Sequence, residues 1–226
     1  MTETKTGDID ATTVKPTTAR DSGRSMSEVV QRDVERMIVT GQIKAGDRIS
    51  EQSIAESLGV SRGPVREAFR TLTEAGLLIA HRNRGVVVRA IDREELLDLY
   101  EIRAALEGEI AASALKKMSE DVLHSLEMVL GDMRDAVERT AAEEYFAANV
   151  QFDAIMIATC PNRKLREVNR QIVRQIQLVR RQKLRQREDM ERSLSEHSRL
   201  LDVLRGGNPD EARKAFRNHI MNARDQ

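Results

Sequence analysis

Residues 59–77, GVSRGPVREAFRTLTEAGL, carry the pattern that decides the fold of this chain. Ser61 can cap the start of a helix, and Pro64 is tolerated in a first helical turn, where its missing N–H would have no partner. Apolar side chains then recur at helical spacing, and Gly76 stands where the helix should end. The sequence therefore predicts a helix whose buried face consists of Val65, Ala68, Phe69 and Leu72.

The opposite face of this helix carries Arg62, Arg66 and Arg70, each about one turn from the next. An α-helix fits the major groove of duplex DNA, where the planar guanidinium of arginine can bond a guanine edge or clamp a phosphate. Gly63 would let the start of the helix approach the DNA backbone, and the free N–H groups there favour phosphate. The alternative is a solvated basic face that binds nothing.

The neighbouring segments predict a winged helix-turn-helix over residues 24–91. Upstream, apolar spacing after Ser25 predicts one helix, and a second, shorter helix runs from Ser50 to Gly59. Downstream, two runs rich in β-branched residues flank the basic turn HRNRG and predict a hairpin. The tip of this hairpin holds Arg82, which is placed to touch the DNA backbone or an adjoining minor groove.

The remaining chain, residues 92–226, is predicted to be helical throughout, and residues 1–23 are predicted to be a disordered tail. Asp92 and Glu95 form a capping-box pattern at the start of the helical part. The predicted fold is therefore mainly α, with an N-terminal winged helix-turn-helix and a C-terminal antiparallel bundle of about six helices. The expected helices cover residues 92–117, 119–139, 141–159, 162–187, 189–205 and 209–223.

The formal net charge of zero conceals segments of opposite charge. Lys and Arg outnumber Asp and Glu by 11 to 8 in residues 24–91 and by 10 to 3 in residues 161–190, whereas residues 92–160 hold 6 against 16. The apolar stripe within residues 161–190 favours a structural, solvated face over a second nucleic-acid site. An aromatic content of 3% with no Trp disfavours single-strand and RNA platforms, which stack bases on rings. Duplex DNA is the nucleic acid that fits this composition.

The sequence shows no apolar run of about 18 residues and no signal-peptide pattern, so it predicts neither a membrane span nor secretion. The single cysteine, Cys160, excludes an intramolecular disulfide and fits a reducing compartment. The protein is therefore expected in the cytoplasm.

The segment GVSRGPVREA, with Leu72 and the turn EAGL after it, closely resembles the GntR family of bacterial regulators over residues 26–91. The following helices resemble the FadR-type subgroup, which implies a C-terminal FCD domain that binds a small carboxylate and forms the homodimer. Gln52 departs from the family pattern, because some relatives carry a DNA-contacting arginine there. The residues that the resemblance places at DNA are Ser61, Arg62, Gly63, Arg66 and Arg82.

Polar side chains interrupt the apolar faces of three predicted helices in the second domain. Asn149 and Asp153 share such a face in one helix, and His197 and His219 do so in two later helices, so all four are expected to point inward. Oxygen ligands with two imidazoles suit a divalent metal such as zinc, nickel or manganese. The alternative is a metal-free pocket with ordinary core histidines. The face of helix 141–159 expected to point inward consists of Phe146, Asn149, Val150, Asp153 and Ile157.

The family resemblance also bears on this metal. Many relatives bind a metal through Asp or Asn, a His four residues later, and two further histidines. Asn149, His197 and His219 match that pattern, whereas Asp153 replaces a histidine but can still ligate.

Arg103 is the candidate effector-binding residue. The spacing by itself allows an i, i+4 ion pair with Glu107, which would be worth little on a helix surface. In similar proteins an arginine at this position reaches the carboxylate of the ligand, which arginine recognises well through two parallel hydrogen bonds.

The function predicted is that of a homodimeric transcription regulator, with repression favoured over activation. Two recognition helices would enter successive major grooves of a palindromic double-stranded operator, and an organic acid in the helical domain would control the affinity. One alternative is a metal-dependent helical-bundle enzyme, but the paired Glu-x-x-His motifs of that class do not occur. Phosphate-loop, nucleophile-elbow and His-Glu-x-x-His motifs are absent too, so the chain is not expected to be an enzyme. The other alternative is a dimerisation protein that does not bind DNA, and the arginine stripe and the wing disfavour that alternative.

Overall fold

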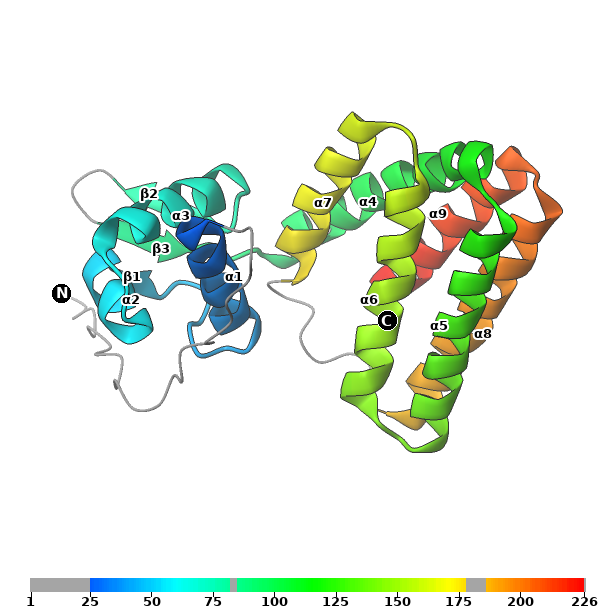
Figure 1. Cartoon of the computed structure of the whole chain (residues 1–226), viewed down its shortest axis with the longest axis horizontal. Coiled ribbons are helices and arrows are strands. Elements are labelled where there is room, and N and C mark those ends of the chain that lie inside the picture. The colour runs from blue at the N-terminus through cyan, green and yellow to red at the C-terminus, as the bar shows by residue number, and fades with distance from the viewer. Residues whose placement is uncertain (1–24, 82–84, 178–185, 226) are drawn as a thin grey trace. The chain divides into compact units, whose positions relative to one another are not determined.

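The computed structural model describes residues 25–81, 85–177 and 186–225 (Figure 1). The predicted tail, residues 1–23, lies outside this range. The chain divides into two compact units, the first made mainly of residues up to Asp92 and the second mainly of residues from Arg93.

Three helices form the body of the first unit: α1 (Met26–Val39), α2 (Glu51–Leu58) and α3 (Arg62–Glu74). The Ser25 hydroxyl accepts a hydrogen bond from the Glu28 N–H, and the Glu28 carboxylate accepts one from the Ser25 N–H, so α1 begins with a capping box. Gly59 ends α2 in the left-handed conformation, with φ of 66°, which lets α3 begin three residues later. The three helices bury a common core that includes Val34, Ile54, Val65 and Leu72.

A small antiparallel sheet completes the first unit. Strands β2 (Leu78–His81) and β3 (Gly85–Val88) form the predicted hairpin, and the short strand β1 (Arg48–Ile49) pairs with the other edge of β3. The sequence did not predict β1, because two residues are too short to show a period. Three helices with this sheet form a winged helix-turn-helix.

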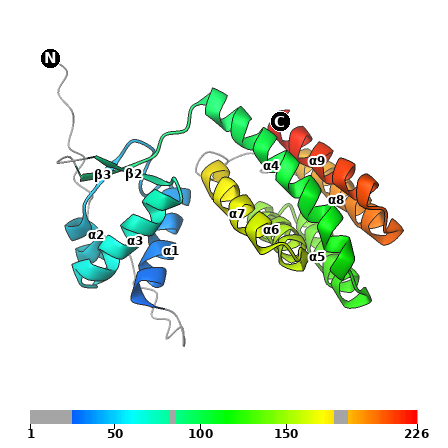
Figure 2. The same ribbon diagram turned by 90° about the horizontal axis from the view of Figure 1, so that it is seen from above.

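The second unit consists of helices. The helix α4 packs along α9, and α5 packs against both α6 and α8, as Figures 1 and 2 show. Large buried side chains fill the space between them, including Leu126, Met133, Tyr145, Phe152 and Phe216. The predicted mainly α fold, a winged helix-turn-helix followed by a bundle of about six helices, is confirmed. Over the described ranges, the α-helices of this unit are α4 (Arg93–Ala114), α5 (Glu120–Glu138), α6 (Ala142–Thr159), α7 (Arg163–Gln177), α8 (Arg187–Gly206) and α9 (Pro209–Asp225).

In the part of the chain that the structure describes, no helix has both the length and the apolar composition needed to cross a membrane.

The contact between α4 and α9 is tightest at Gly108. A Cβ atom built there would lie 2.9 Å from the Arg213 carbonyl oxygen and 3.2 Å from the Arg213 Cγ. Because a backbone atom cannot swing away, we expect Gly108→Ala to lower the free energy of unfolding by about 1–3 kcal/mol. Denaturant unfolding followed by tyrosine fluorescence measures this. Tyr100 and Tyr145 are the chain's two tyrosines, both are buried in the second unit, and the chain has no Trp.

Gly131→Ala in α5 is the matched control. No heavy atom lies within 4 Å of a Cβ built at Gly131, so alanine there should raise stability by up to about 1 kcal/mol through helix propensity. Equal stabilisation by both alanines would contradict the close α4–α9 contact.

Candidate functional site

The face of α3 that points away from the core presents a row of arginines. The side chains of Arg62, Arg66 and Arg70 are 61%, 68% and 61% exposed. The opposite face is buried through the predicted residues Val65, Ala68, Phe69 and Leu72. The guanidinium groups of α3 therefore lie where another molecule can reach them, as the sequence spacing predicted.

Each of these arginines is held by a carboxylate. Glu51, in the first turn of α2, accepts hydrogen bonds from the Arg66 Nε (3.0 Å) and Nη2 (2.9 Å) and from the Arg62 Nη2 (3.4 Å). These bonds, chiefly those from Arg66, lower the pKa of the Glu51 carboxyl. Arg70 pairs instead with Glu67 and Glu74 on its own helix. The contact of Glu51 with Arg66 was not predicted from the sequence, because Glu51 lies 15 residues before Arg66 and no local pattern joins them.

The start of α3 has no side-chain cap and has space around its backbone. Ser61 occupies the N-cap position, as expected, but its side chain makes no capping hydrogen bond, unlike that of Ser50. A Cβ built on Gly63 would meet no heavy atom within 4 Å. The Gln52 amide donates to the Glu56 carboxylate (3.0 Å) on the surface of α2. Arg82, the remaining predicted DNA residue, lies outside the described residues.

The predicted effector residue Arg103 is buried in the second unit, with 4% of its surface exposed. Its Nε donates to Glu107 (2.6 Å), which is the ion pair that the spacing allowed, and its Nη2 donates to Asp153 on α6 (3.0 Å). Burial disfavours the charged guanidinium, but the two carboxylates outweigh burial and raise the pKa of Arg103. For Glu107, burial also disfavours the charged form and therefore raises the pKa of the carboxyl group, although Arg103 opposes that shift.

The two predicted histidines lie next to each other, with ring centroids 4.6 Å apart. The His197 Nδ1 lies 2.8 Å from the Ser193 carbonyl oxygen, and the His219 Nδ1 lies 2.8 Å from the Glu196 carboxylate. A carbonyl oxygen only accepts, so the His197 Nδ1 carries the proton and its Nε2 has a free lone pair. That Nε2 is buried, with no hydrogen-bond partner among the described residues. Burial, with a smaller effect from His219, lowers the pKa of His197 to about 4.

These groups form one polar cluster, which we define as Arg103, Glu107, Asp153, Glu196, His197 and His219. The charges of Asp153, His219 and Glu196 act on His197, and those of Asp153 and His219 act on Glu107, so α4, α6, α8 and α9 all contribute to it. Asn149 is also buried, at 7% exposure, one turn before Asp153 on α6. Glu196 was not predicted from sequence, because a glutamate beside a helix face is usually solvated.

Part of the inward face predicted for α6 is wrong. Phe146 and Val150 are 41% and 38% exposed, whereas Asn149 and Ile157 are buried. Residues 142–159 carry apolar side chains on every side, so periodicity could not define which side meets the core. The side that is buried consists of Tyr145, Ala148, Asn149, Phe152, Met156 and Ile157.

The structure does not show a metal site at the predicted ligands. Among the described residues, no group of three or more His, Cys, Asp or Glu side chains is arranged to hold a metal ion. The carboxylate of Asp153, which would supply an anionic ligand, is paired with the Arg103 guanidinium instead. The two imidazoles provide suitable nitrogens, and a metal held by them together with Asn149 and Asp153 stays a prediction.

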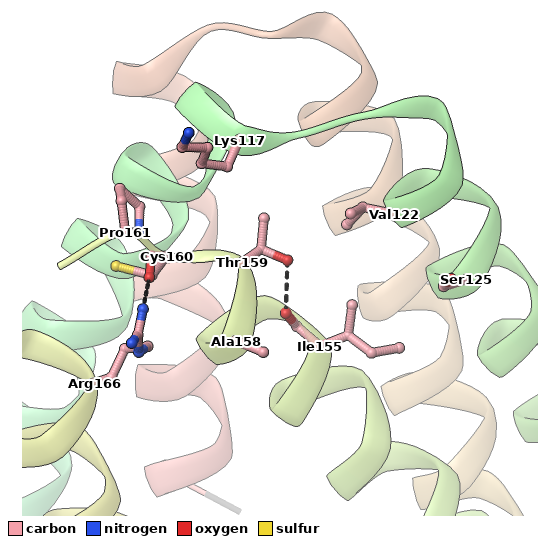
Figure 3. A pocket seen from close by; sticks show the side chains of 9 residues that line it. All are labelled: Lys117, Val122, Ser125, Ile155, Ala158, Thr159, Cys160, Pro161 and Arg166. Atoms are coloured by element: carbon pink, nitrogen blue, oxygen red, sulfur yellow. Dashed lines mark hydrogen bonds between the residues drawn. The ribbon is translucent and has the colours of Figure 1, made fainter. Parts of the chain in front are cut away.

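A separate pocket of about 480 Å³ lies where η1 (Leu115–Lys117), α5, the end of α6 and the start of α7 meet. Figure 3 shows Lys117 and Arg166 at this pocket, with the Arg166 guanidinium donating to the Cys160 carbonyl oxygen. Cations beside a helix C-terminus stabilise its unpaired carbonyl groups. The pocket shares no residue with the polar cluster, and Arg166 bonds the end of α6.

Comparison with known proteins assigns both units. Residues 26–88 match the family model "Bacterial regulatory proteins, gntR family", and residues 98–222 match the FCD domain. The HTH-type transcriptional regulator YdhC of Bacillus subtilis is 28% identical over 188 residues, which are 83% of this chain and 84% of YdhC. The HTH-type transcriptional repressor RspR of Escherichia coli is 32% identical over 137 residues, 60% of each chain.

Among solved structures, E. coli McbR/YncC superposes with a TM-score of 0.75 over 88% of this chain and 95% of that one. At 21% identity this likeness shows the fold. The matched families and relatives are regulators and not enzymes, which confirms that part of the prediction. The chain is therefore a transcriptional regulator that belongs to the GntR family of bacterial regulatory proteins and carries an FCD domain.

Proposed function

We propose that this regulator binds a palindromic operator as a homodimer in the cytoplasm and releases it when a small organic acid occupies the polar cluster. The observation that carries the proposal is the exposed arginine row on α3 of a winged helix-turn-helix. Repression is the favoured mode, because RspR, a relative, is named a repressor. A coupling of about 1–3 kcal/mol between the two sites would change operator affinity roughly 5- to 150-fold.

At the operator, Arg62 and Arg66 would reach base edges or phosphates in the major groove. The uncapped Ser61 hydroxyl and the open backbone at Gly63 would meet a phosphate at the start of α3, where free N–H groups and the helix dipole favour an anion. Arg82 would contact the backbone from the wing.

In the second unit, Arg103 would bind the carboxylate of the effector. The acid would have to take the place of Asp153 on the guanidinium, because Asp153 and Glu107 already occupy it. The cluster holds three carboxyl groups and one guanidinium, so a further anion is favoured only if positive charge arrives with it. Glu107, whose pKa is raised by burial, is the carboxyl group that would take up a proton and so supply this positive charge.

A divalent metal, with zinc, nickel or manganese as the candidates, would be a second way to bring positive charge. The observation that favours a metal is the buried, unpartnered Nε2 of His197, and the one against it is the pairing of Asp153 with Arg103. Elemental analysis of the purified protein tests this. A stoichiometric metal that is lost in His197→Asn would support a site that includes Asn149, Asp153, His197 and His219, and metal-free protein would exclude it.

The test of DNA binding is to recover the fragments of host genomic DNA that the purified protein retains at near-physiological salt. We expect a few fragments that share a palindrome. Arg66→Ala should weaken binding to that palindrome roughly ten- to hundredfold, since one bidentate base contact carries about that discrimination. Arg139→Ala, which removes an equal charge from an exposed ion pair in the second unit, should leave it unchanged. Equal binding by Arg66→Ala and the wild type would contradict the proposed role of α3.

A further inference from the structure

Among the residues that the structure describes, Glu51 binds one edge of the Arg66 guanidinium and no residue is bonded to the other edge. The hydrogen bonds run from Nε and Nη2 of Arg66 to the two carboxylate oxygens. A guanidinium has five N–H groups, so both N–H groups of Nη1 and the second one of Nη2 stay available along the end of the side chain. The Arg66 side chain is 68% exposed and the Glu51 side chain is 24% exposed, so the guanidinium lies at the surface beside a carboxylate that is partly covered.

We propose that Glu51 is a positioning residue that gives this regulator its DNA sequence specificity. It holds Arg66 so that the end of the guanidinium meets a base edge, and it cancels charge that would otherwise attract any phosphate. This inference rests on the proposed role of α3 in reading the operator.

The first part of the argument concerns order. A free arginine samples many rotamers, and binding must fix one of them at a cost in entropy. The bidentate bond to Glu51 fixes the Nε–Nη2 edge before DNA arrives, and end-on contact with a guanine uses the other edge. Loss of the Glu51 carboxylate should therefore weaken binding to the preferred sequence.

The second part of the argument concerns charge. Non-specific binding follows the number of cations that neutralise phosphates and release counterions. Glu51 lies within 3.4 Å of both Arg62 and Arg66, so its negative charge reduces the attraction of these two guanidiniums for every phosphate. Loss of the carboxylate should therefore strengthen binding to arbitrary DNA. The two effects have opposite signs, and together they lower specificity.

The test uses a duplex library of about 30 random base pairs, long enough for two half-sites one helical turn apart. The full-length wild type selects its preferred duplex from this library. Fluorescence anisotropy then gives the affinity of each variant for that duplex and for the unselected library. The variants are Glu51→Gln, Glu51→Asp and the matched control Glu56→Gln, which removes the same charge from an exposed residue of α2 that bonds Gln52 and no arginine of α3.

We expect Glu51→Gln to lower the ratio of selected to unselected affinity about tenfold, with weaker binding of the selected duplex and tighter binding of the library. Glu56→Gln should leave the ratio unchanged. Glu51→Asp keeps the charge on a shorter side chain, so it should weaken binding of the selected duplex without tightening binding of the library. Circular dichroism checks that each variant is folded, and the exposed pair contributes little to stability.

Arg66→Ala separates the possible failures. If Arg66→Ala does not weaken binding of the selected duplex, the proposed role of α3 is wrong. If Arg66→Ala weakens it but Glu51→Gln changes the ratio no more than Glu56→Gln does, the role of α3 stands and Glu51 has no positioning function. A rise in affinity for both DNAs by the same factor in Glu51→Gln would reduce Glu51 to a charge effect and overturn the proposal.

Discussion

Arg103→Met is expected to lower the free energy of unfolding of the second unit by about 3–5 kcal/mol, because it leaves the buried carboxyl group of Glu107 without its cation. Glu107 is 5% exposed and bonds Arg103 at 2.6 Å. The variant therefore removes the cation that lies next to this buried carboxyl group. Asp153 loses its bond to the same guanidinium. Urea unfolding followed by tyrosine fluorescence measures the change, since both tyrosines report on this unit.

A second variant tests the cause of this loss. In Arg103→Met/Glu107→Gln the buried carboxylate is gone, so much of the lost stability should return. Arg139→Met, which breaks the exposed pair with Glu144, should have a much smaller effect than Arg103→Met. If the double variant is no more stable than Arg103→Met, the loss reflects packing of the arginine side chain and not an unpaired buried charge.

Between pH 6.5 and pH 4 the wild type should lose about 3 kcal/mol of stability through His197, at about 1.4 kcal/mol per unit of pKa shift. The pKa of His197 is about 4 in the folded protein, because burial disfavours the imidazolium, compared with 6.5 for an unperturbed histidine. Above pH 6.5 the ring is neutral in both states and nothing is lost. As the pH falls from 6.5 to 4, the unfolded chain takes up a proton that the folded protein refuses, so unfolding becomes easier.

His197→Asn isolates this contribution. The raised pKa of Glu107 acts in the opposite sense, since its stabilising effect is present at low pH and is lost as the pH rises. The quantity to compare is therefore the difference in unfolding free energy between wild type and His197→Asn, measured from pH 4 to pH 7 with a chelator present. That difference should fall steadily as the solution is acidified below pH 6.5. A constant difference would mean that the imidazole is solvated or paired in the folded protein.

Both predictions treat the polar cluster as a place where the protein gives up stability. A buried ion pair is often no more stable than apolar side chains of the same size, and an unpartnered imidazole nitrogen adds a further cost. Local violations of good packing in a folded protein tend to occur at functional sites. This cost is consistent with the proposal that the cluster is a ligand site, and binding of an organic acid, measured separately from stability, distinguishes a ligand site from a core network.

The sequence predicted α3 in detail, including its bounds, its buried face and its arginine row. Helical spacing is a local property, so the two faces of one helix follow from the order of residues alone. Helical spacing did not predict the inward face of α6, because that helix has apolar residues on every side. Phe146 and Val150, which were expected to point inward, are exposed. Helical spacing did predict that His197 and Asn149 point inward, since both lie among regularly spaced apolar neighbours.

By itself, then, the sequence determined the mainly α fold, the winged helix-turn-helix and the family, because these depend on spacing and motifs within short segments. Only the tertiary structure decided which charges meet. Glu51 reaches Arg66 across 15 residues and Arg103 reaches Asp153 across 50, and each pair comes from two different helices. Such contacts depend on how the helices pack, which is set by the whole core and not by any local pattern.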